Sequence, residues 1–392
     1  MKVKNLKIRE ILASTSVKTI EVEIETEKGL SKASVPIGTS RGKNEVNYIT
    51  AEAAVNKFHI IRRDFRLQTF ADQKEVDSLL RMIDKTPNFG EIGGNLALAI
   101  SSAFLKAFAL ENNQEVYEFL GGNKIPRPIC NIVGGWKGQS DIQEFLLLPV
   151  HQKSFLENIV KIAAAYRETG EMLKTVDNTF NFGKNIESAW ITRLNFEEIL
   201  YILTRIANSK LLKIGLDVAA SHLWDGELYR YMRNSLDRNE QIGFIEEIVR
   251  RYPITYIEDP LEENDFLGFS VITSRLQPRL VCGDDIYATN MQRLKMGFEH
   301  RATNAVLIKP SQIGTITDAI EVADKAKKNN MITVMSHRSG ETDDNLITHL
   351  AVGLNCDYIK IGISGERIVK INEMIRIEDK ISGEKTPLIK MK

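Results

Sequence analysis

Three acidic residues each follow a short apolar run of the kind that forms a buried strand. Asp217 ends the run in GLDVAAS, Glu258 lies in ITYIEDP, and Asp284 lies in RLVCGDD. Buried parallel strands read as near-continuous apolar runs, and these carboxylates stand where the runs become polar. Oxygen ligands that converge from separate strands suit Mg²⁺. One such acid is more often simply solvated, but three in series predict a magnesium site at a barrel rim.

Two lysines occupy equivalent places in later runs. Lys309 ends the run in AVLIKPS, and Lys360 lies in DYIKIG. A lysine close to a divalent cation and to a second cation has a lowered pKa and can act as a base near neutral pH. Abstraction of a proton next to a carboxylate creates an enediolate, whose charge a metal ion stabilises. The pattern therefore favours Lys309 as a base beside a metal.

The segment SHRSGET, residues 336–342, directly follows the apolar run ITVM. The planar guanidinium of Arg338 can hold an oxyanion, Ser339 adds a hydroxyl donor, and Gly340 lets backbone amides approach closely. His337 alone would more often be structural, but beside Arg338 and Ser339 it is assigned to the site. The segment predicts a cradle for a phosphate or carboxylate.

Length and composition limit the class of protein. The 392 residues predict two domains, and 52 basic against 52 acidic residues give no net charge that would favour nucleic acid or membrane partners. The cysteines, Cys130, Cys282 and Cys356, are far apart and lack metal-type spacing, which indicates structural thiols in a reducing compartment. The N-terminus has no apolar core typical of a signal peptide, and the apolar stretch from Leu96 to Leu110 is too short to span a bilayer. We expect a cytoplasmic protein.

The secondary-structure elements that must position these residues follow two different sequence patterns, one in each part of the chain. Residues 19–26 alternate strictly between apolar and acidic side chains and predict a strand with one wet face, followed by a returning strand near 33–37. A glycine-bracketed loop at 38–42 is expected to move, and helical periods continue to about residue 112. Residues 1–127 are therefore expected to form a small α+β domain with a three-stranded sheet and helices.

From residue 128 onward, short apolar runs alternate with stretches of helical length. This repetition predicts a βα barrel over residues 128–392, with an active site at the carboxyl ends of its strands. Seven runs are centred on Phe145, Leu216, Ile257, Val281, Leu307, Val334 and Ile359, and a weaker one covers 128–133.

The chain as a whole resembles the enolase family. The strings that carry the resemblance are VPIG, GGNLALAIS, QEF, LLLPV, LDVAAS, IEDP, GDD, NAVLIKPSQIGT, SHRSGET and GER, in this order. The resemblance implies an enolase-type barrel whose second strand runs opposite to the others. It also implies two Mg²⁺ sites and, as the activity, dehydration of 2-phosphoglycerate to phosphoenolpyruvate in glycolysis; the superfamily is a standard example of a lysine base acting beside Mg²⁺.

The resemblance also implies roles for individual residues. Asp217, Glu258 and Asp284 would hold the first Mg²⁺, and Ser40 would contact the second. Lys309 would be the base and Glu144 a further catalytic residue near the leaving hydroxyl. The substrate would be bound by Arg338, Ser339, Lys360, His337, Gln143 and Lys137, with Asp285 and Gln312 behind the site.

The sequence departs from the family at several of these places. The family loop VGDEGGFAP aligns without gaps on residues 176–184, which read VDNTFNFGK, so that Thr179 stands at the family's catalytic glutamate. Asp177 or Glu144 would then have to supply the acid. Lys137 falls near a family histidine. Thr15 stands at an arginine of the family's dimer contact, so that contact does not carry over to this chain; a homodimer or higher homo-oligomer is still the expectation.

These departures leave alternatives open. The chain could act as an enolase, or as a paralogue that takes another phosphorylated or polyanionic hydroxy acid. Arg41 and Lys137 add positive charge, while Asn178 and Thr179 replace acids, which favours a more highly charged anion. A third interpretation is a non-catalytic metal-binding and anion-binding protein that kept the fold.

Overall fold

The computed structural model describes residues 1–38, 42–135, 141–151 and 154–383. The first part of the chain forms an antiparallel three-stranded sheet in the order β1-β2-β3, with β1 at Asn5–Leu12, β2 at Lys18–Glu25 and β3 at Leu30–Ser34. In β2, the apolar face is fully buried, because Ile20, Val22 and Ile24 point toward the helices. The returning strand lies slightly earlier than the predicted range of 33–37.

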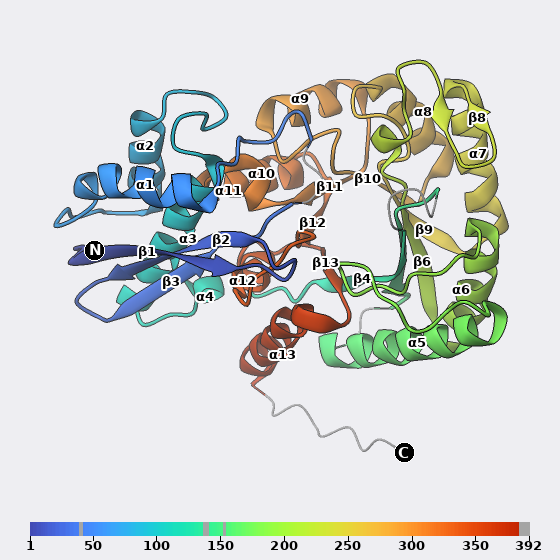
Figure 1. The fold of residues 1–392 in the computed structure, drawn as a ribbon, viewed down its shortest axis with the longest axis horizontal. Coiled ribbons are helices and arrows are strands. Elements are labelled where there is room, and N and C mark those ends of the chain that lie inside the picture. The colour runs from blue at the N-terminus through green and yellow to red at the C-terminus, as the bar shows by residue number, and fades with distance from the viewer. Residues whose placement is uncertain (39–41, 136–140, 152–153, 384–392) are drawn as a thin grey trace.

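Four helices complete this part of the fold (Figure 1). They are α1 (Ala51–Ile61), α2 (Gln73–Ile83), α3 (Gly94–Glu111) and the short α4 (Val116–Phe119), with a 3-10 turn at Arg62–Asp64. The helix α3 is apolar on all sides and packs against β2 and β3, which explains why the stretch from Leu96 to Leu110 is so hydrophobic. Among the residues that the structure describes, no helix is both long and apolar enough to cross a lipid bilayer.

The second part of the chain is a closed barrel of eight strands in the order β4-β5-β6-β9-β10-β11-β12-β13. All eight predicted runs form its strands: β4 (Arg127–Gly134), β5 (Glu144–Pro149), β6 (Leu212–Asp217), β9 (Ile254–Glu258), β10 (Leu280–Gly283), β11 (Ala305–Ile308), β12 (Ile332–Ser336) and β13 (Tyr358–Gly362). The predicted fold class, a small α+β domain followed by a TIM-like βα barrel with one reversed strand, is confirmed.

One barrel strand runs against the rest. The strand β5 pairs antiparallel with both β4 and β6, whereas the other neighbouring strands pair in parallel. This is the reversed second strand that the family resemblance implied. As a consequence, the first residue of β5, Glu144, lies at the rim where the other strands end.

Helices surround the barrel, as Figure 1 shows. They are α5 (Phe155–Val176), α6 (Phe196–Lys210), α7 (Arg238–Arg251), α8 (Phe266–Leu276), α9 (Met291–His300), α10 (Pro310–Ile313), α11 (Ile316–Lys328), α12 (Leu346–Gly353) and α13 (Ile368–Ser382). Two 3-10 turns, η2 (Ala220–His222) and η3 (Gly365–Arg367), and a small hairpin of β7 (Tyr229–Arg230) and β8 (Ser235–Leu236) lie between them.

Beneath the rim, the barrel interior is a layer of mostly apolar side chains. Side chains from the strands fill it, namely Ile129, Leu146, Leu148, Tyr256, Cys282, Ala305, Leu307, Val334 and Tyr358. The three cysteines are all buried and none forms a disulfide, as expected for structural thiols. Above this layer the strands turn polar, and the charged residues of the rim begin.

Buried polar contacts join the two parts of the chain. The backbones of Ile37 and Gly340 exchange two hydrogen bonds, of 2.7 and 2.8 Å. The carboxylate of Asp77 on α2 accepts the backbone N–H of Thr317 at 2.9 Å and so caps the start of α11. Lys106 on α3 pairs with Asp344 at 2.8 Å. These contacts hold the N-terminal sheet and helices against the barrel rim.

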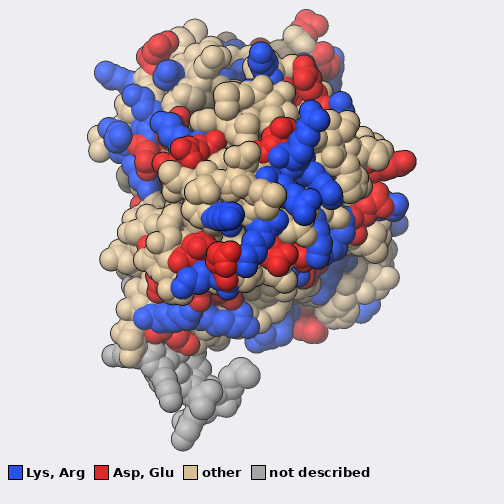
Figure 2. All heavy atoms as spheres, turned by 90° about the vertical axis from the view of Figure 1, so that its left-hand side faces the viewer, with Lys and Arg blue, Asp and Glu red and all other residues tan. Residues whose placement is uncertain are grey.

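The surface carries charges of both signs. Figure 2 shows Lys and Arg interspersed with Asp and Glu over the face formed by the N-terminal part of the chain. This mixture agrees with the absence of net charge in the sequence.

Candidate active site

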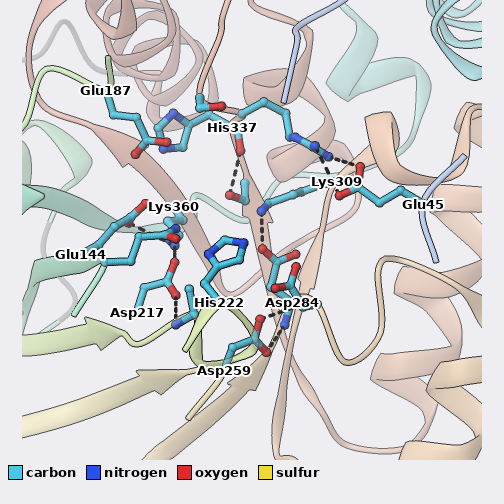
Figure 3. Close-up of a pocket in the computed structure, with 16 residues that line it drawn as sticks. Glu45, Glu144, Glu187, Asp217, His222, Asp259, Asp284, Lys309, His337 and Lys360 are labelled. Atoms are coloured by element: carbon cyan, nitrogen blue, oxygen red, sulfur yellow. Dashed lines mark hydrogen bonds and ion pairs between the residues drawn. The ribbon is translucent and has the colours of Figure 1, made fainter. Parts of the chain in front are cut away.

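A cavity of about 50 Å³ opens at the rim where the parallel strands end. Side chains from both parts of the chain surround it (Figure 3), and most of them are charged. The lining residues are Glu45, Gln143, Glu144, Glu187, Asp217, Ala219, His222, Asp259, Asp284, Asp285, Lys309, Ser336, His337, Arg338, Ser339 and Lys360. The structure thus brings together nine predicted site residues: Gln143, Glu144, Asp217, Asp284, Lys309, His337, Arg338, Ser339 and Lys360.

Three neighbouring strands place carboxylates at one level of the rim. Glu144 of β5 pairs in register with Asp217 of β6, and Asp217 pairs with Glu258 of β9. Asp217 and Glu258 are the last residues of their strands, and Glu144 joins them because β5 is reversed. The result is a row of three carboxylates along one wall.

The ammonium group of Lys360 reaches this row from β13. Its Nζ lies 2.7 Å from Glu258, 2.8 Å from Asp217 and 3.1 Å from Glu144. Burial lowers the pKa of Lys360, but the attraction of Asp217, Glu144 and Glu258 outweighs burial and raises that pKa well above its ordinary value. Lys360 is therefore a fixed positive charge in the centre of the site.

Glu258 lies beneath the others and has no exposed surface. It accepts a hydrogen bond of 2.6 Å from the hydroxyl group of Tyr256 in the barrel layer. Burial, together with the charge of Asp217, raises the pKa of Glu258 to about 8. Burial likewise raises the pKa of Glu144 well above its ordinary value. Burial and the neighbouring carboxyl groups thus make Glu144 and Glu258 hold a proton more firmly than isolated carboxyl groups do.

Lys309 approaches from β11 and bonds directly to the carboxylate of Asp284. Gln312 donates to the other oxygen of Asp284 at 2.9 Å. Burial and the charges of Arg338 and Lys360 lower the pKa of Lys309, but Asp284 outweighs them, so the net pKa is raised. Asp284, a predicted metal ligand, is thus the partner that keeps Lys309 charged here. The lowered pKa predicted for Lys309 refers to the residue beside a divalent cation and stays a prediction.

The predicted metal ligands do not form one group in this structure. Among the described residues, the carboxylates within 4.8 Å of one another belong to Asp259, Asp284 and Asp285. Asp217 and Glu258 instead face Lys360, because its ammonium group extends between them. Of the predicted trio, only Asp284 belongs to this closer group. Ser40, predicted to contact a second Mg²⁺, lies outside the described residues.

The donor chemistry nevertheless suits a hard divalent cation. Asp259 accepts the backbone N–H groups of Asp284 and Asp285 at 3.0 and 2.7 Å, which fixes the segment that carries both. Burial and the charge of Asp284 raise the pKa of Asp285 to about 7. Such repulsion among buried carboxylates is what a divalent cation relieves. The residues present therefore fit Mg²⁺.

Arg338 forms the opposite wall with Glu45. Its guanidinium bonds to the two carboxylate oxygens of Glu45 at 2.8 and 3.3 Å, and it lies 3.4 Å from Ser311. Both partners are almost fully buried. The fork of Arg338 thus already binds a carboxylate in the side-on geometry that a substrate anion requires. Lys137, predicted to bind substrate, lies outside the described residues.

Sequence reasoning missed Glu187. This residue follows the loop after α5, lines the cavity, and accepts a hydrogen bond of 3.2 Å from Asn131 of β4. Trp190 anchors its segment, since the Trp190 backbone bonds to Ile132 at 2.9 Å and the ring stacks on Tyr166 with centroids 4.5 Å apart. The pocket lining therefore includes Glu187 in addition to Glu45 and Glu144.

Thr179 and Asp177 occupy a different place. Asp177 directly follows α5, and its carboxylate accepts hydrogen bonds from Thr179, Thr192 and the backbone of Arg193. Burial raises the pKa of Asp177, but these bonds outweigh burial and hold the pKa far below its usual range. Neither Asp177 nor Thr179 is among the described residues that line the cavity.

The expectation that Thr179 stands in the place of the family's catalytic glutamate, with Asp177 as one candidate acid, therefore needs correction, because neither residue lines the cavity in the part of the chain that the structure describes. Glu187, which lies eight residues after Thr179, lines the cavity instead. An alignment with a gap of eight residues would place Glu187, and not Thr179, at the family's catalytic glutamate. The buried Trp190, three residues later, is the feature of the sequence that could have indicated this gap.

His222 is a further lining residue that the sequence did not indicate, as are Glu45, Ala219 and Asp259. It ends η2, just after β6, and Figure 3 shows its ring projecting into the cavity between Asp217 and Asp284. The string LDVAAS indicated Asp217 as a site residue, but it gave no indication that His222, which directly follows the string, also belongs to the site. The site thus carries two imidazoles, His222 and His337.

Comparisons with known proteins agree with this geometry. The family model described as "Enolase, N-terminal domain" matches residues 3–120, and the one described as "Enolase, C-terminal TIM barrel domain" matches residues 123–387. Among curated proteins, the chain is 38% identical to the enolase of Methanothermobacter thermautotrophicus over 97% of both chains. It is also 38% identical to the enolases of Archaeoglobus fulgidus, covering 97% of this chain and 98% of the relative, and of Picrophilus torridus, covering 97% and 99%.

Proposed function

Because this chain belongs to the enolase family, we propose that it is a Mg²⁺-dependent hydro-lyase that converts 2-phosphoglycerate into phosphoenolpyruvate. The observation that carries the proposal is the meeting of Lys309, the buried Lys360, the glutamates Glu144 and Glu187, and the guanidinium of Arg338 around one cavity. The substrate would be a small anion that the side chains of the cavity bind, and the proposal involves no macromolecular partner.

In the proposed reaction, Lys309 removes the proton from the carbon next to the substrate carboxylate. Lys360 balances the charge of that carboxylate, and Arg338 with Ser339 binds the phosphate. Asp217, Glu258 and Asp284, which stand on the same rim although their carboxylates are not all within 4.8 Å of one another, would hold one Mg²⁺, with Asp285 close by. When bound, Mg²⁺ would supply positive charge to the enediolate oxygens and would compensate the charge of Asp284.

Departure of the hydroxyl group forms the second half of the reaction. We assign this side of the cavity to Glu144 and Glu187, which line it together with Gln143. A carboxyl group placed there can donate the proton that the leaving hydroxyl needs. The paralogue interpretation depended on the loss of a glutamate, so Glu187 removes the main reason to prefer another substrate.

The proposal is tested by measuring the conversion of 2-phosphoglycerate into phosphoenolpyruvate through the ultraviolet absorbance of the product. The assay is run once with Mg²⁺ and once with a chelator. We expect activity that requires Mg²⁺ and that falls by roughly 10²- to 10⁴-fold in Lys309→Ala, because a positioned base contributes about that much. Lys328→Ala, an exposed lysine on α11, is the matched control and should keep the full rate. Absence of product from the unaltered protein, or a fully active Lys309→Ala, would contradict the proposal.

A further inference from the structure

Arg367 is a buried arginine that connects the two halves of the site from behind. It ends η3, at the start of α13, and has no exposed surface. It is not among the described residues that line the cavity. Its position nevertheless lets its guanidinium contact the segments that carry His337, Arg338 and Glu187.

The hydrogen bonds of Arg367 go to four acceptors. Its Nε donates to Nδ1 of His337 at 3.3 Å, and Nη1 donates to the carbonyl of Ile186 at 3.0 Å. Its Nη2 donates to the carbonyls of Arg338 and Ser339 at 3.1 and 2.6 Å. Ile186 directly precedes Glu187, so one guanidinium holds both the anion cradle and the glutamate segment.

The bond to His337 determines where the ring carries its hydrogen. A guanidinium has only donors and remains charged in proteins, so Nδ1 of His337 must offer its lone pair to it. A neutral imidazole has one N–H, which then resides on Nε2. Burial, and the charges of Arg367, Lys360, Lys309 and Lys370, lower the pKa of His337 well below its ordinary value. The ring is therefore neutral.

We propose that Arg367 is a positioning residue that holds His337 as the Nε2–H tautomer and so directs a hydrogen-bond donor from His337 into the cavity. The proposal deepens the proposed function, because the acceptor for that donor would be a substrate oxygen. The tautomer itself does not depend on which substrate binds. The same contacts keep Glu187 and the segment from Arg338 to Ser339 at a fixed separation.

Lys370 provides a matched control on the same helix. It is also fully buried, and its Nζ donates to the carbonyl of Thr342 at 2.7 Å and pairs with Glu341 at 3.0 Å. Glu341 in turn accepts the backbone N–H of Arg338 at 2.8 Å. Lys370 thus supports the far end of the same segment without a hydrogen bond to His337 among the described contacts.

The experiment is nitrogen NMR of the full chain labelled with ¹⁵N-histidine, in which His337→Gln identifies the signals of His337. In the unaltered protein we expect Nε2 to carry the hydrogen and Nδ1 to be unprotonated at neutral pH. In Arg367→Met we expect the ratio of the two tautomers to shift by roughly tenfold toward Nδ1–H, the size expected for loss of one hydrogen bond. Lys370→Met should leave that ratio unchanged, and Arg367→Lys should restore part of it.

A kinetic measurement complements the spectrum. We expect Arg367→Met to lower kcat for phosphoenolpyruvate formation more than it raises KM, because a wrongly oriented donor acts on the reacting substrate. Lys370→Met should instead lower thermal stability, and it should change kcat/KM less than Arg367→Met does.

Two results would overturn the inference. One is a His337 in the unaltered protein that carries its hydrogen on Nδ1 or on both nitrogens, which needs no variant and decides the matter even if Arg367→Met does not fold. The other is an unchanged tautomer ratio in a folded Arg367→Met. Failure of the proposed function appears separately, as absence of phosphoenolpyruvate formation in a protein whose His337 still shows the expected tautomer.

Discussion

Individual residues at strand ends account for most of what the sequence could reveal about the site. Asp217, Asp284, Lys309 and Lys360 all lie at the cavity, because the end of a buried strand fixes where its side chain emerges. Glu187 lies in a loop, where no such rule applies. An alignment without gaps therefore placed Thr179 at the family's catalytic glutamate. In the structure, the backbone contact of Trp190 with β4 holds this loop so that Glu187 lies at the cavity.

Substitution of Glu187 tests this reassignment. Glu187→Gln keeps the size of the side chain and its contact with Asn131 but removes the carboxyl group. We expect kcat to fall by roughly 10²- to 10⁴-fold with little change in thermal stability, because an acid–base group contributes that much to rate. The measurement is steady-state formation of phosphoenolpyruvate beside a thermal unfolding curve.

Thr179→Val serves as the control for the same loop. It should keep the full rate, since its hydroxyl group bonds to Asp177 at 2.7 Å and Thr179 is not among the described residues that line the cavity. A strong loss of activity in Thr179→Val together with an active Glu187→Gln would show that the original alignment was right.

At the scale of elements, apolar runs located all eight barrel strands but could not show their direction. Periodicity reports which side chains are buried and is the same for a strand read either way. The reversal of β5 came only from the family resemblance, yet it decides that Glu144, and not Pro149 at the other end of the strand, faces the site. The short hairpin of β7 and β8 was not predicted, because two-residue strands leave no period to detect.

The segment after β3 provides a prediction about the arginine fork. A Cβ atom added at Gly38 would come within 1.8 Å of the Arg338 guanidinium, so Gly38→Ala should displace it from the cradle. We expect KM for 2-phosphoglycerate to rise by roughly 10- to 100-fold, the equivalent of losing a charge-assisted hydrogen bond, as measured by initial rates.

Gly42→Ala is the paired control for this change. The nearest atom to its added Cβ would be 3.7 Å away, an ordinary contact, so KM should stay close to that of the unaltered protein. Equal effects of the two substitutions would indicate that the loss comes from the backbone of this segment and not from Arg338.

At the scale of the whole molecule, the site depends on docking between the two parts of the chain. Glu45 comes from the N-terminal part and Arg338 from the barrel, and they meet only because contacts such as those of Asp77 and Asp344 hold the parts together. The sequence predicted both parts, but it could not predict these pairs, since nothing local links residues so far apart along the chain.

The pair of Lys106 and Asp344 gives this docking a dependence on pH. Burial raises the pKa of Asp344, but Lys106 and the backbone N–H groups of Ser34 and Leu346 outweigh it, so the folded pKa is depressed. A depressed carboxyl pKa contributes stability that is complete above the unfolded pKa of about 4 and is lost as the pH falls below it.

Asp344→Asn should therefore lower the free energy of unfolding by roughly 3 kcal/mol at pH 7, because Lys106 loses its partner. The difference from the unaltered protein should shrink when urea unfolding is repeated below about pH 4. Asp343→Asn, at the exposed neighbouring position, is the control and should change little at either pH. A difference that stays constant with pH would mean that Asp344 contributes through packing and not through its charge.

The reversed strand also bears on the order in which the molecule folds. β4 and β5 are consecutive antiparallel strands, so they can pair early, whereas β13 must arrive from much further along the chain to close the barrel against β4. Contacts between nearby residues cost less chain entropy and tend to form first. We expect the β4–β5 hairpin to act as a folding nucleus, with Lys360 joining its carboxylate partners only in the final closing step.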